Sequence, residues 1–459
     1  MENAIIILCI VCAVAAFLTE RNMHNPAFLL SVLFGFMMIL SSMRLYGLYA
    51  ISQRSLNIIF IGVLSLNIGF YASRFVKKNL RIRKQSVGRI SVQPMTLNNE
   101  RDIGGVDLNS WGIRAIQFLA IVACVYIGLK AVNCISLLLS GMTMAQIRNT
   151  VVEGYATDNP IFHGMLDYLL LVYIMQLFHR IGMTVGVAIF FMTNGKQRKL
   201  LYISAVTCLF MVFTNGGRFI ILTFLVELLG GFLICRKRKG RQLSPKVKRI
   251  IAASVLAGVA VVLIFTSMRK GSASLEFIRR EIYVYFGYVF PFMDYHITNY
   301  AGEFTYGVTF LFGLLDFPVF VLHNVFGMDY PSAYSATRVL DGLVQQTQVV
   351  GANWLGMNAF TTMFFYFFVN GGETAVCICA FIYSFFISGL YFDAKRSLNL
   401  RTVVLYCIAL VSVFMSFVRY QFGTHTLVYE LLAVQLLFRK DGSARFALRL
   451  GHKSAGGAK

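Results

Sequence analysis

Five arginines stand out because of where they fall in the sequence. Arg218 follows two glycines in "TNGGRFIIL" and begins a long apolar run. A glycine pair lets the backbone turn sharply, and free N–H groups in the first turn of a helix assist anion binding. A planar guanidinium binds phosphate oxygens through two parallel hydrogen bonds, which a lysine cannot match. The pattern predicts a phosphate-binding site built from Arg148, Arg218, Arg279, Arg280 and Arg419.

Several residues on the outer side are candidates for acid–base catalysis, namely Asp294, His296, Glu303, Asp316, His323, Asp329, His425 and Glu430. Three of them stand out. Asp294 and His296 are two apart in the aromatic segment "MDYHITNY", and His425 follows Arg419 in "VRYQFGTH". A general base takes a proton from a reacting hydroxyl, as imidazole and carboxylate groups do. The alternative for each histidine is a structural hydrogen bond, and for each arginine a snorkelling side chain bound to lipid headgroups. No acidic pair has metal-site spacing and no nucleotide-binding loop occurs in the sequence, so we expect neither a metal nor another cofactor.

The composition shows what must position these residues. Apolar residues make up 57% of the chain and charged residues 14%, whereas a soluble chain carries roughly 25% charged residues. Charge-free windows of about 17 to 19 residues, close to the length that crosses a bilayer, recur along the chain. We predict an all-α polytopic transmembrane helix bundle. Its about eleven spanning helices lie near 3–19, 26–43, 55–73, 111–131, 162–192, 200–214, 218–235, 250–267, 374–392, 402–418 and 426–438.

The net charge of +22 is concentrated at the ends of the apolar runs. Seven Lys or Arg residues fall in 74–89 and eight in 236–249. This is the positive-inside pattern, so the charge indicates topology and not nucleic-acid binding. With eleven spans it places the N-terminus in the periplasm and the C-terminus in the cytoplasm. Residues 1–438 then form one integral membrane domain, and 439–459 form a cytoplasmic basic tail.

The longest non-cytoplasmic segment, 268–373, is rich in Phe and Tyr. Its stretch "GVTFLFGLLDFPVFVLHNVFG" is apolar, but Asp316 and Pro318 near the centre argue against a membrane span. A span there would also leave the loops out of register with the basic clusters. We predict a large external loop whose amphipathic helices lie on the membrane surface. Its aromatic side chains suit sugar rings and equally suit the membrane interface.

Three stretches resemble the oligosaccharide repeat-unit polymerases of the Wzy type, also called O-antigen polymerases. They are "TNGGRFIIL", "YGVTFLFGLLDFPV" and "GMNAFTTMFFYFFVNGGETAV", and the layout of 110–435 is similar too. The resemblance implies a fold related to the membrane-embedded glycosyltransferases (GT-C), with a lipid-facing cavity open to the periplasm. Members often carry an acidic residue before the glycine of the last stretch. Asn370 stands there in this chain, so we assign no acid at that position.

The resemblance also implies a function. A bacterial inner-membrane glycosyltransferase would use undecaprenyl-pyrophosphate-linked oligosaccharide and join repeat units into a surface polysaccharide, either the O-antigen of lipopolysaccharide or a capsule. Arginines would stabilise the pyrophosphate leaving group without a metal. Two alternatives stay open: an O-antigen ligase that uses the same donor, and a lipid-linked oligosaccharide transporter or flippase. The expected partners are this substrate and membrane lipids. Whether a chain-length-regulating co-polymerase binds is also open.

Overall fold

The computed structural model describes residues 1–87, 102–103, 106–107, 111–153, 159–215, 219–235, 244–270, 275–352 and 354–439. These residues are mostly helical, and seven of their helices are long and apolar enough to cross a membrane. The prediction of an all-α, multi-pass membrane protein is therefore confirmed. Each predicted span also coincides with a helix, although four of these helices are shorter than a typical span.

The chain contains the following helices in order. They are α1 (Glu2–Glu20), α2 (Pro26–Ser42), η1 (Leu45–Gly47), α3 (Gln53–Val87), α4 (Trp111–Leu139), α5 (Met144–Glu153), α6 (Met165–Leu169), the π-helix η2 (Leu170–Met175), α7 (Gln176–Met192), α8 (Lys199–Asn215), α9 (Phe219–Cys235), α10 (Pro245–Lys270), α11 (Leu275–Gly287), α12 (Val289–Thr298), α13 (Val308–Phe326), α14 (Ser332–Gln345), α15 (Thr362–Val369), α16 (Gly372–Arg396), α17 (Leu400–Phe414), η3 (Met415–Phe417), η4 (Gln421–Gly423) and α18 (His425–Leu437). Two short antiparallel pairs join β1 (Asp102–Ile103) to β2 (Val106–Asp107) and β3 (Gln348–Val349) to β4 (Gly356–Met357).

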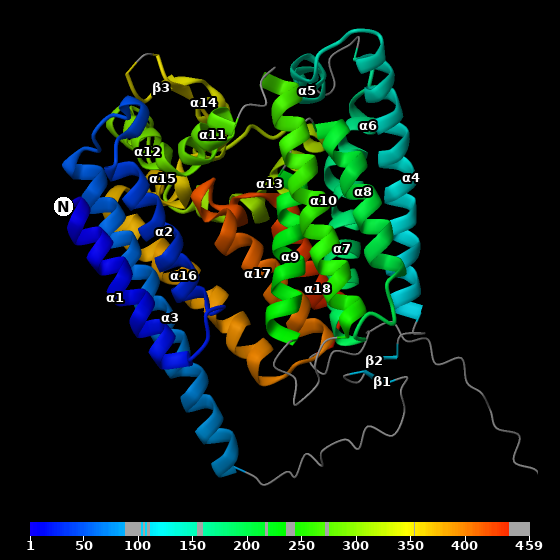
Figure 1. Cartoon of the computed structure of the whole chain (residues 1–459), viewed down its shortest axis with the longest axis horizontal. Coiled ribbons are helices and arrows are strands. Elements are labelled where there is room, and N and C mark those ends of the chain that lie inside the picture. Colours follow the sequence, from blue (N-terminus) through cyan, green and yellow to red (C-terminus); the bar gives the residue numbers. More distant parts are fainter. Residues whose placement is uncertain are drawn as a thin grey trace, which may run out of the picture.

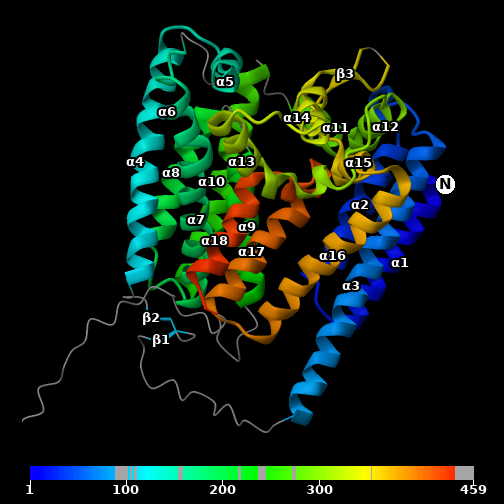
Figure 2. The same cartoon turned by 180° about the vertical axis from the view of Figure 1, so that it is seen from behind.

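Two groups of long helices stand side by side, as Figures 1 and 2 show from opposite sides. One group contains α1, α2, α3 and α16, and the other contains α4, α7, α8, α9, α10 and α18. Helix α17 connects them, because it packs against α16 on one side and against α7 and α9 on the other. The cap, defined here as α11–α15, lies at one end of the molecule, and β1 and β2 lie at the opposite end.

The cap is tied to the ends of the long helices by specific hydrogen bonds. Ser41 at the end of α2 donates to the Gly287 carbonyl oxygen (2.6 Å). The backbone N–H of Thr361, just before α15, donates to the carbonyl of Val418, just after α17 (3.2 Å). Helices α2 and α17 therefore end at the cap, and α3 and α18 begin there, as alternating spans require.

The opposite end carries two of the predicted cytoplasmic basic clusters. Glu20, the last residue of α1, accepts hydrogen bonds from Arg74 (2.8 Å) and from Lys395. Lys77 donates to Asp393 at 2.6 Å. Arg74 and Lys77 of the basic cluster 74–89 thus lie at the same end of the bundle as Lys395 on α16, and their shared position supports the charge-based topology.

Glycines let α3 pack closely against both α16 and α15. A Cβ atom at Gly69 would lie 2.5 Å from the Phe381 carbonyl oxygen, and one at Gly62 would lie 2.4 Å from the Phe364 ring. Neither the backbone nor a packed ring can move far enough to make room for a Cβ atom, so only glycine fits at these two positions. Contacts of this kind are a common means of packing helices in membranes.

Helix α13 is the point at which the topology needs a direct test. It is long and apolar enough to cross a membrane, and only 11% of its apolar window is buried. The sequence analysis instead placed it on the membrane surface, within the external loop 268–373. It packs mainly against α14, α15, α18 and η4.

Reporter fusions should place the segment that follows α13 on the outside of the membrane. We expect an outside signal near Gly154 and Ser335, because the positive-inside rule leaves these segments away from the basic clusters. Fusions after Gly88, Gly240, Arg396 and Gly442 should report the cytoplasm. A cytoplasmic signal from Ser335 would show that α13 spans the membrane and that the external-loop prediction is wrong.

Candidate functional site

His425 and Asp316 are in direct contact where α18 begins against the middle of α13. Nδ1 of His425 lies 2.9 Å from Oδ2 of Asp316. The same carboxylate accepts hydrogen bonds from the hydroxyls of Tyr334 on α14 (2.9 Å) and Tyr173 on η2 (3.2 Å). Four separate elements therefore meet at one carboxylate. Because Asp316 faces Nδ1, it fixes the ring orientation and leaves Nε2 as the basic nitrogen.

The second ring nitrogen of His425 is not satisfied. Nε2 is buried and has no hydrogen-bond partner among the described residues. The Tyr173 ring packs against the imidazole with a centroid separation of 4.5 Å. A buried nitrogen without a partner is costly, so a hydroxyl group that reached it would gain a hydrogen bond that the folded chain lacks. An imidazole oriented by a carboxylate, with its other nitrogen available, is the arrangement of a general base.

An apolar groove of about 560 Å³ lies beside this pair. Leucine, isoleucine and aromatic side chains from α6, η2, α7, α13 and α18 line it, and no charged side chain does. Tyr173 belongs both to the groove wall and to the hydrogen bonds of Asp316, and Phe317 lines the groove as the next residue along α13. Such a surface suits the hydrocarbon chain of a lipid, with the chain's polar head near His425.

Aromatic side chains link the pair to a cation on α14. The Tyr334 ring stacks on Tyr330 with centroids 5.2 Å apart, and the guanidinium of Arg338 lies 5.3 Å from the Tyr330 ring centre. Burial, followed by the nearby charge of Asp316, raises the pKa of Tyr334. The hydroxyl therefore stays protonated and donates a hydrogen bond to Asp316. Arg338 thus reaches the neighbourhood of the pair through two tyrosines, although it was not among the five predicted phosphate-binding arginines.

The predicted arginines are distributed over several parts of the cap end. Arg419 lies between η3 and η4, with its guanidinium 5.4 Å from the Tyr366 ring centre on α15. Arg148 is half-buried on α5, which packs against α4 and α8. Arg279 and Arg280 are exposed on α11. Their convergence in one pocket stays a prediction.

Arg218 lies outside the described residues, but its neighbour in the sequence is well placed. Phe219 begins α9, and its ring lies 5.6 Å from the ring of Phe360, which precedes α15. Phe360 in turn stacks on Phe417 at 5.9 Å with nearly parallel rings. Phe417 is two residues before Arg419, so the start of α9 is close to the turn that carries Arg419 and leads to His425.

Asp294 takes part in a structural contact. It accepts hydrogen bonds from the backbone N–H of Ser52 (3.1 Å) and from the Ser52 hydroxyl, and so fixes the start of α3. Its predicted catalytic role is untested, but its carboxylate already has donors.

His296 lies in an aromatic environment on α12. Its ring is 4.6 Å from Phe292 and 5.4 Å from Phe365 between centroids, and Nε2 has no partner among the described residues. Burial lowers the pKa of His296 to about 4, so the side chain is neutral near pH 7. Helix α12 packs on α2 and α15, whereas α18 packs on α7 and α13, so His296 and His425 occupy different parts of the molecule.

His296 should make the folded protein sensitive to acid. Its pKa falls from 6.5 to about 4 on folding, so the folded state binds a proton less readily than the unfolded state. Its contribution to stability is complete above pH 6.5 and is lost as the pH falls toward 4, by on the order of 3 kcal/mol. Thermal midpoints of the detergent-solubilised protein across this range should show a shallower pH dependence for His296→Gln than for the parent. Equal slopes would contradict the assignment.

Two other charges on the cap side have partners that explain them without a ligand. Lys130, buried on α4, forms an ion pair with Asp167 on α6 and donates to the Ile161 carbonyl at 3.0 Å. Arg44, exposed at the end of α2, lies 3.2 Å from Glu2. Neither cation is needed to account for substrate binding.

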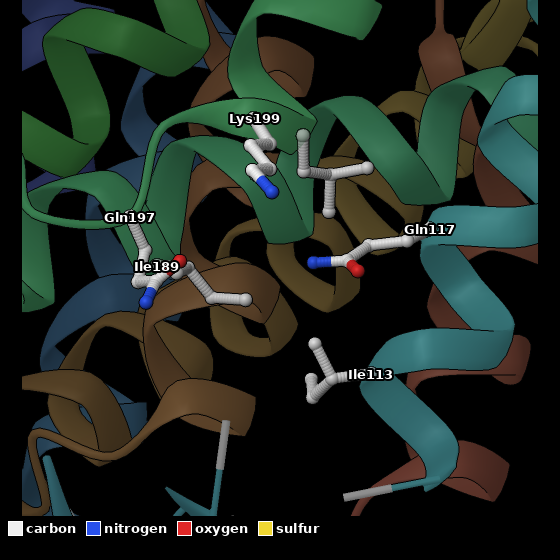
Figure 3. A pocket seen from close by; sticks show the side chains of 7 residues that line it. Ile113, Gln117, Ile189, Gln197 and Lys199 are labelled. Carbon is white, nitrogen blue, oxygen red and sulfur yellow. The ribbon is translucent and has the colours of Figure 1, made fainter. Parts of the chain in front are cut away.

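A second cavity, of about 20 Å³, lies between α4, α7 and α8. Gln117 from α4 and Lys199 from α8 extend toward one another across it, and Gln197 lies at its side (Figure 3). A space of this size holds about one water molecule, which these polar groups can bind. It is too small for a substrate.

A third polar feature is a charged cluster inside the helix bundle. Arg180 on α7 contacts Glu430 on α18, with Nη2 3.1 Å from Oε2, and the same nitrogen lies 3.8 Å from Glu227 on α9. Both glutamates are fully buried. Ionisable residues at such depth are costly in a membrane protein, and they often mark a functional site.

Comparisons with known proteins add no assignment: no family model, no curated protein and no solved structure matches this chain. Within the part of the chain that the structure describes, no group of three or more His, Cys, Asp or Glu side chains is arranged to hold a metal ion. The functional interpretation therefore depends on the geometry around His425.

Proposed function

We propose that this protein is a glycosyltransferase of the bacterial inner membrane that joins lipid-linked oligosaccharide repeat units into a surface polysaccharide. The observation that carries the proposal is the His425–Asp316 pair beside an apolar groove of about 560 Å³. The pair supplies a base, and the groove suits the first part of an isoprenoid chain. The donor in this proposal is an undecaprenyl-pyrophosphate-linked oligosaccharide, used on the periplasmic side.

The reaction assigns one role to each part of this site. The acceptor hydroxyl of the incoming repeat unit attacks the anomeric carbon of the growing chain, and the carbon–oxygen bond to the pyrophosphate breaks. Nε2 of His425 takes the hydroxyl proton while Asp316 stabilises the imidazolium that forms. The pyrophosphate leaves with the bonding electrons and stays attached to its lipid. Arginine side chains would stabilise its charge. Arg419 lies six residues before His425, and Arg218 immediately precedes α9.

An O-antigen ligase would use the same donor and the same base, so the geometry around His425 fits it equally. The two enzymes differ only in the acceptor. A transporter of lipid-linked oligosaccharide is the second candidate from another class, and one observation favours it. The buried Arg180–Glu227–Glu430 cluster resembles the ionisable groups that transporters place at membrane depth.

Purified protein in lipid vesicles with lipid-linked repeat units should distinguish these candidates. We expect a ladder of products of increasing length, and the ladder should persist in EDTA because arginines replace a metal in the proposed mechanism. Ladder formation that is lost in EDTA and restored by added metal would contradict the mechanism. Transfer only onto a lipid A-core acceptor would identify a ligase, and movement of the intact donor across the bilayer without new bonds would identify a transporter.

A further inference from the structure

The buried Arg180–Glu227–Glu430 cluster has unequal numbers of positive and negative groups. One guanidinium and two carboxylates sum to a charge of −1 when all three are ionised. Glu227 and Glu430 have no exposed surface, and the bundle around them consists of α7, α8, α9, α17 and α18. An uncompensated charge in such surroundings costs more than binding a proton does, so one carboxyl group is expected to be neutral.

The two acids differ in their contacts. Glu430 accepts from Nε of Arg180 at 3.2 Å, lies 3.1 Å from Nη2, and also accepts from the Thr184 hydroxyl. Glu227 lies 3.8 Å from the same Nη2, and neither of its oxygens has a hydrogen-bond partner among the described residues. Hydrogen bonds favour the charged form of a carboxyl group, so we expect Glu227, which lacks them, to be the neutral acid.

The other titratable groups near the cluster do not supply the missing positive charge. His179 precedes Arg180 on α7, and its Nε2 faces the Cys208 thiol of α8 at 3.6 Å. A proton on His179 would place a second cation next to Arg180, which like-charge repulsion opposes. Cys208 on α8 and Cys407 on α17 are buried thiols, and a thiol cannot carry a positive charge.

We infer that the Arg180–Glu227–Glu430 cluster is a proton-binding site, in which Glu227 holds the proton and Glu430 is the partner of Arg180. The inference goes beyond the proposed function and holds for a polymerase, a ligase or a transporter alike. If Glu227 lost its proton, two negative carboxylates would pair with the single guanidinium of Arg180. Arg180 on α7 contacts Glu430 on α18, so this contact between the two helices would weaken. Because His425 begins α18, the protonation of Glu227 is coupled to the helix that carries the base.

Infrared spectroscopy of the purified protein counts neutral carboxyl groups directly. The parent should show the carbonyl band of a protonated glutamic acid near neutral pH, and isotopic labelling of glutamate should shift it. Glu227→Gln should remove the band. Glu430→Gln should remove it too, because Arg180 then has Glu227 as its only acid and ionises it. Glu303→Gln, at an exposed glutamate, should leave the band unchanged.

Stability distinguishes the two acids. Glutamine has the shape of a neutral glutamic acid, so Glu227→Gln should keep the parent's thermal midpoint. Glu430→Gln removes the partner that Arg180 contacts at 3.1 Å and should lower the midpoint by several degrees. A parent protein without the protonated-acid band would overturn the proposal, as would a band that persists in Glu227→Gln. These readouts do not involve polymer synthesis, so the proton site and the proposed function can fail separately.

Discussion

Replacing His425 with glutamine should stop polymer growth while the protein remains in the membrane at its normal level. The glutamine amide can still donate to Asp316, so the contact between α18 and α13 is kept. It cannot accept a proton from the acceptor hydroxyl. Loss of a positioned general base typically slows a reaction by about 100-fold to 10,000-fold. A surface polysaccharide that normally forms a ladder of lengths should then be reduced to a single repeat unit on a gel.

His163→Gln is the matched control for this experiment. His163 is an exposed histidine just before α6, and its backbone N–H donates to Asp167 at 2.9 Å. The same substitution there should leave the full ladder. A full-length ladder from His425→Gln at normal protein level would refute the base and leave His425 as a structural partner of Asp316.

Asp316→Asn tests the orienting half of the pair. The amide oxygen can still accept from Tyr173 and Tyr334, so the local packing is preserved. The negative charge that stabilises the imidazolium is lost, and the amide can present N–H to Nδ1 and so favour the wrong tautomer. We expect the rate constant for polymerisation to fall strongly while apparent substrate affinity changes little. A fall in affinity alone would place Asp316 in substrate binding.

The helical layout could be predicted from the sequence because it depends on local properties. Charge-free windows mark the helices, and basic clusters mark one end of them, so the helices predicted at 3–19 and 26–43 correspond closely to α1 and α2. The predicted span 162–192 differs from the others because it is longer than one membrane crossing needs, and His179 and Arg180 interrupt its apolar run. The structure shows one continuous helical segment of α6, η2 and α7, with Arg180 paired to Glu430 inside the bundle.

The pairing of residues distant in the chain could not be predicted in the same way. The sequence presents Asp316 both as an acid–base candidate and as an argument against a membrane span, and it presents His425 as a base without a named partner. Their contact depends on how α18 packs against α13, which no local pattern encodes. A signal did exist, since a carboxylate at the centre of an apolar run is costly and implies a partner. Glu227 and Glu430 carry the same signal.

The prediction for Arg218 depends on this neighbourhood and on the glycines that precede it. Phe219 packs on Phe360 and Phe360 on Phe417, which brings the start of α9 near the turn of Arg419 and His425. The first turn of α9 also offers free backbone N–H groups to an anion. A pyrophosphate leaving group would be well placed there. We therefore expect Arg218 to bind it through two parallel hydrogen bonds.

Arg218→Lys should make little or no polymer at normal protein level. Lysine keeps the positive charge but lacks the planar pair of N–H donors that arginine has. The substitution therefore lowers activity only if Arg218 binds the pyrophosphate through two hydrogen bonds at once. Losing one well-placed stabiliser of developing charge typically costs about 100-fold to 1000-fold in rate. Arg44→Lys is the control, because a lysine can keep the exposed contact to Glu2, and its polymer should be normal. Full-length polymer from Arg218→Lys would show that this arginine only extends toward lipid headgroups, where either cation serves.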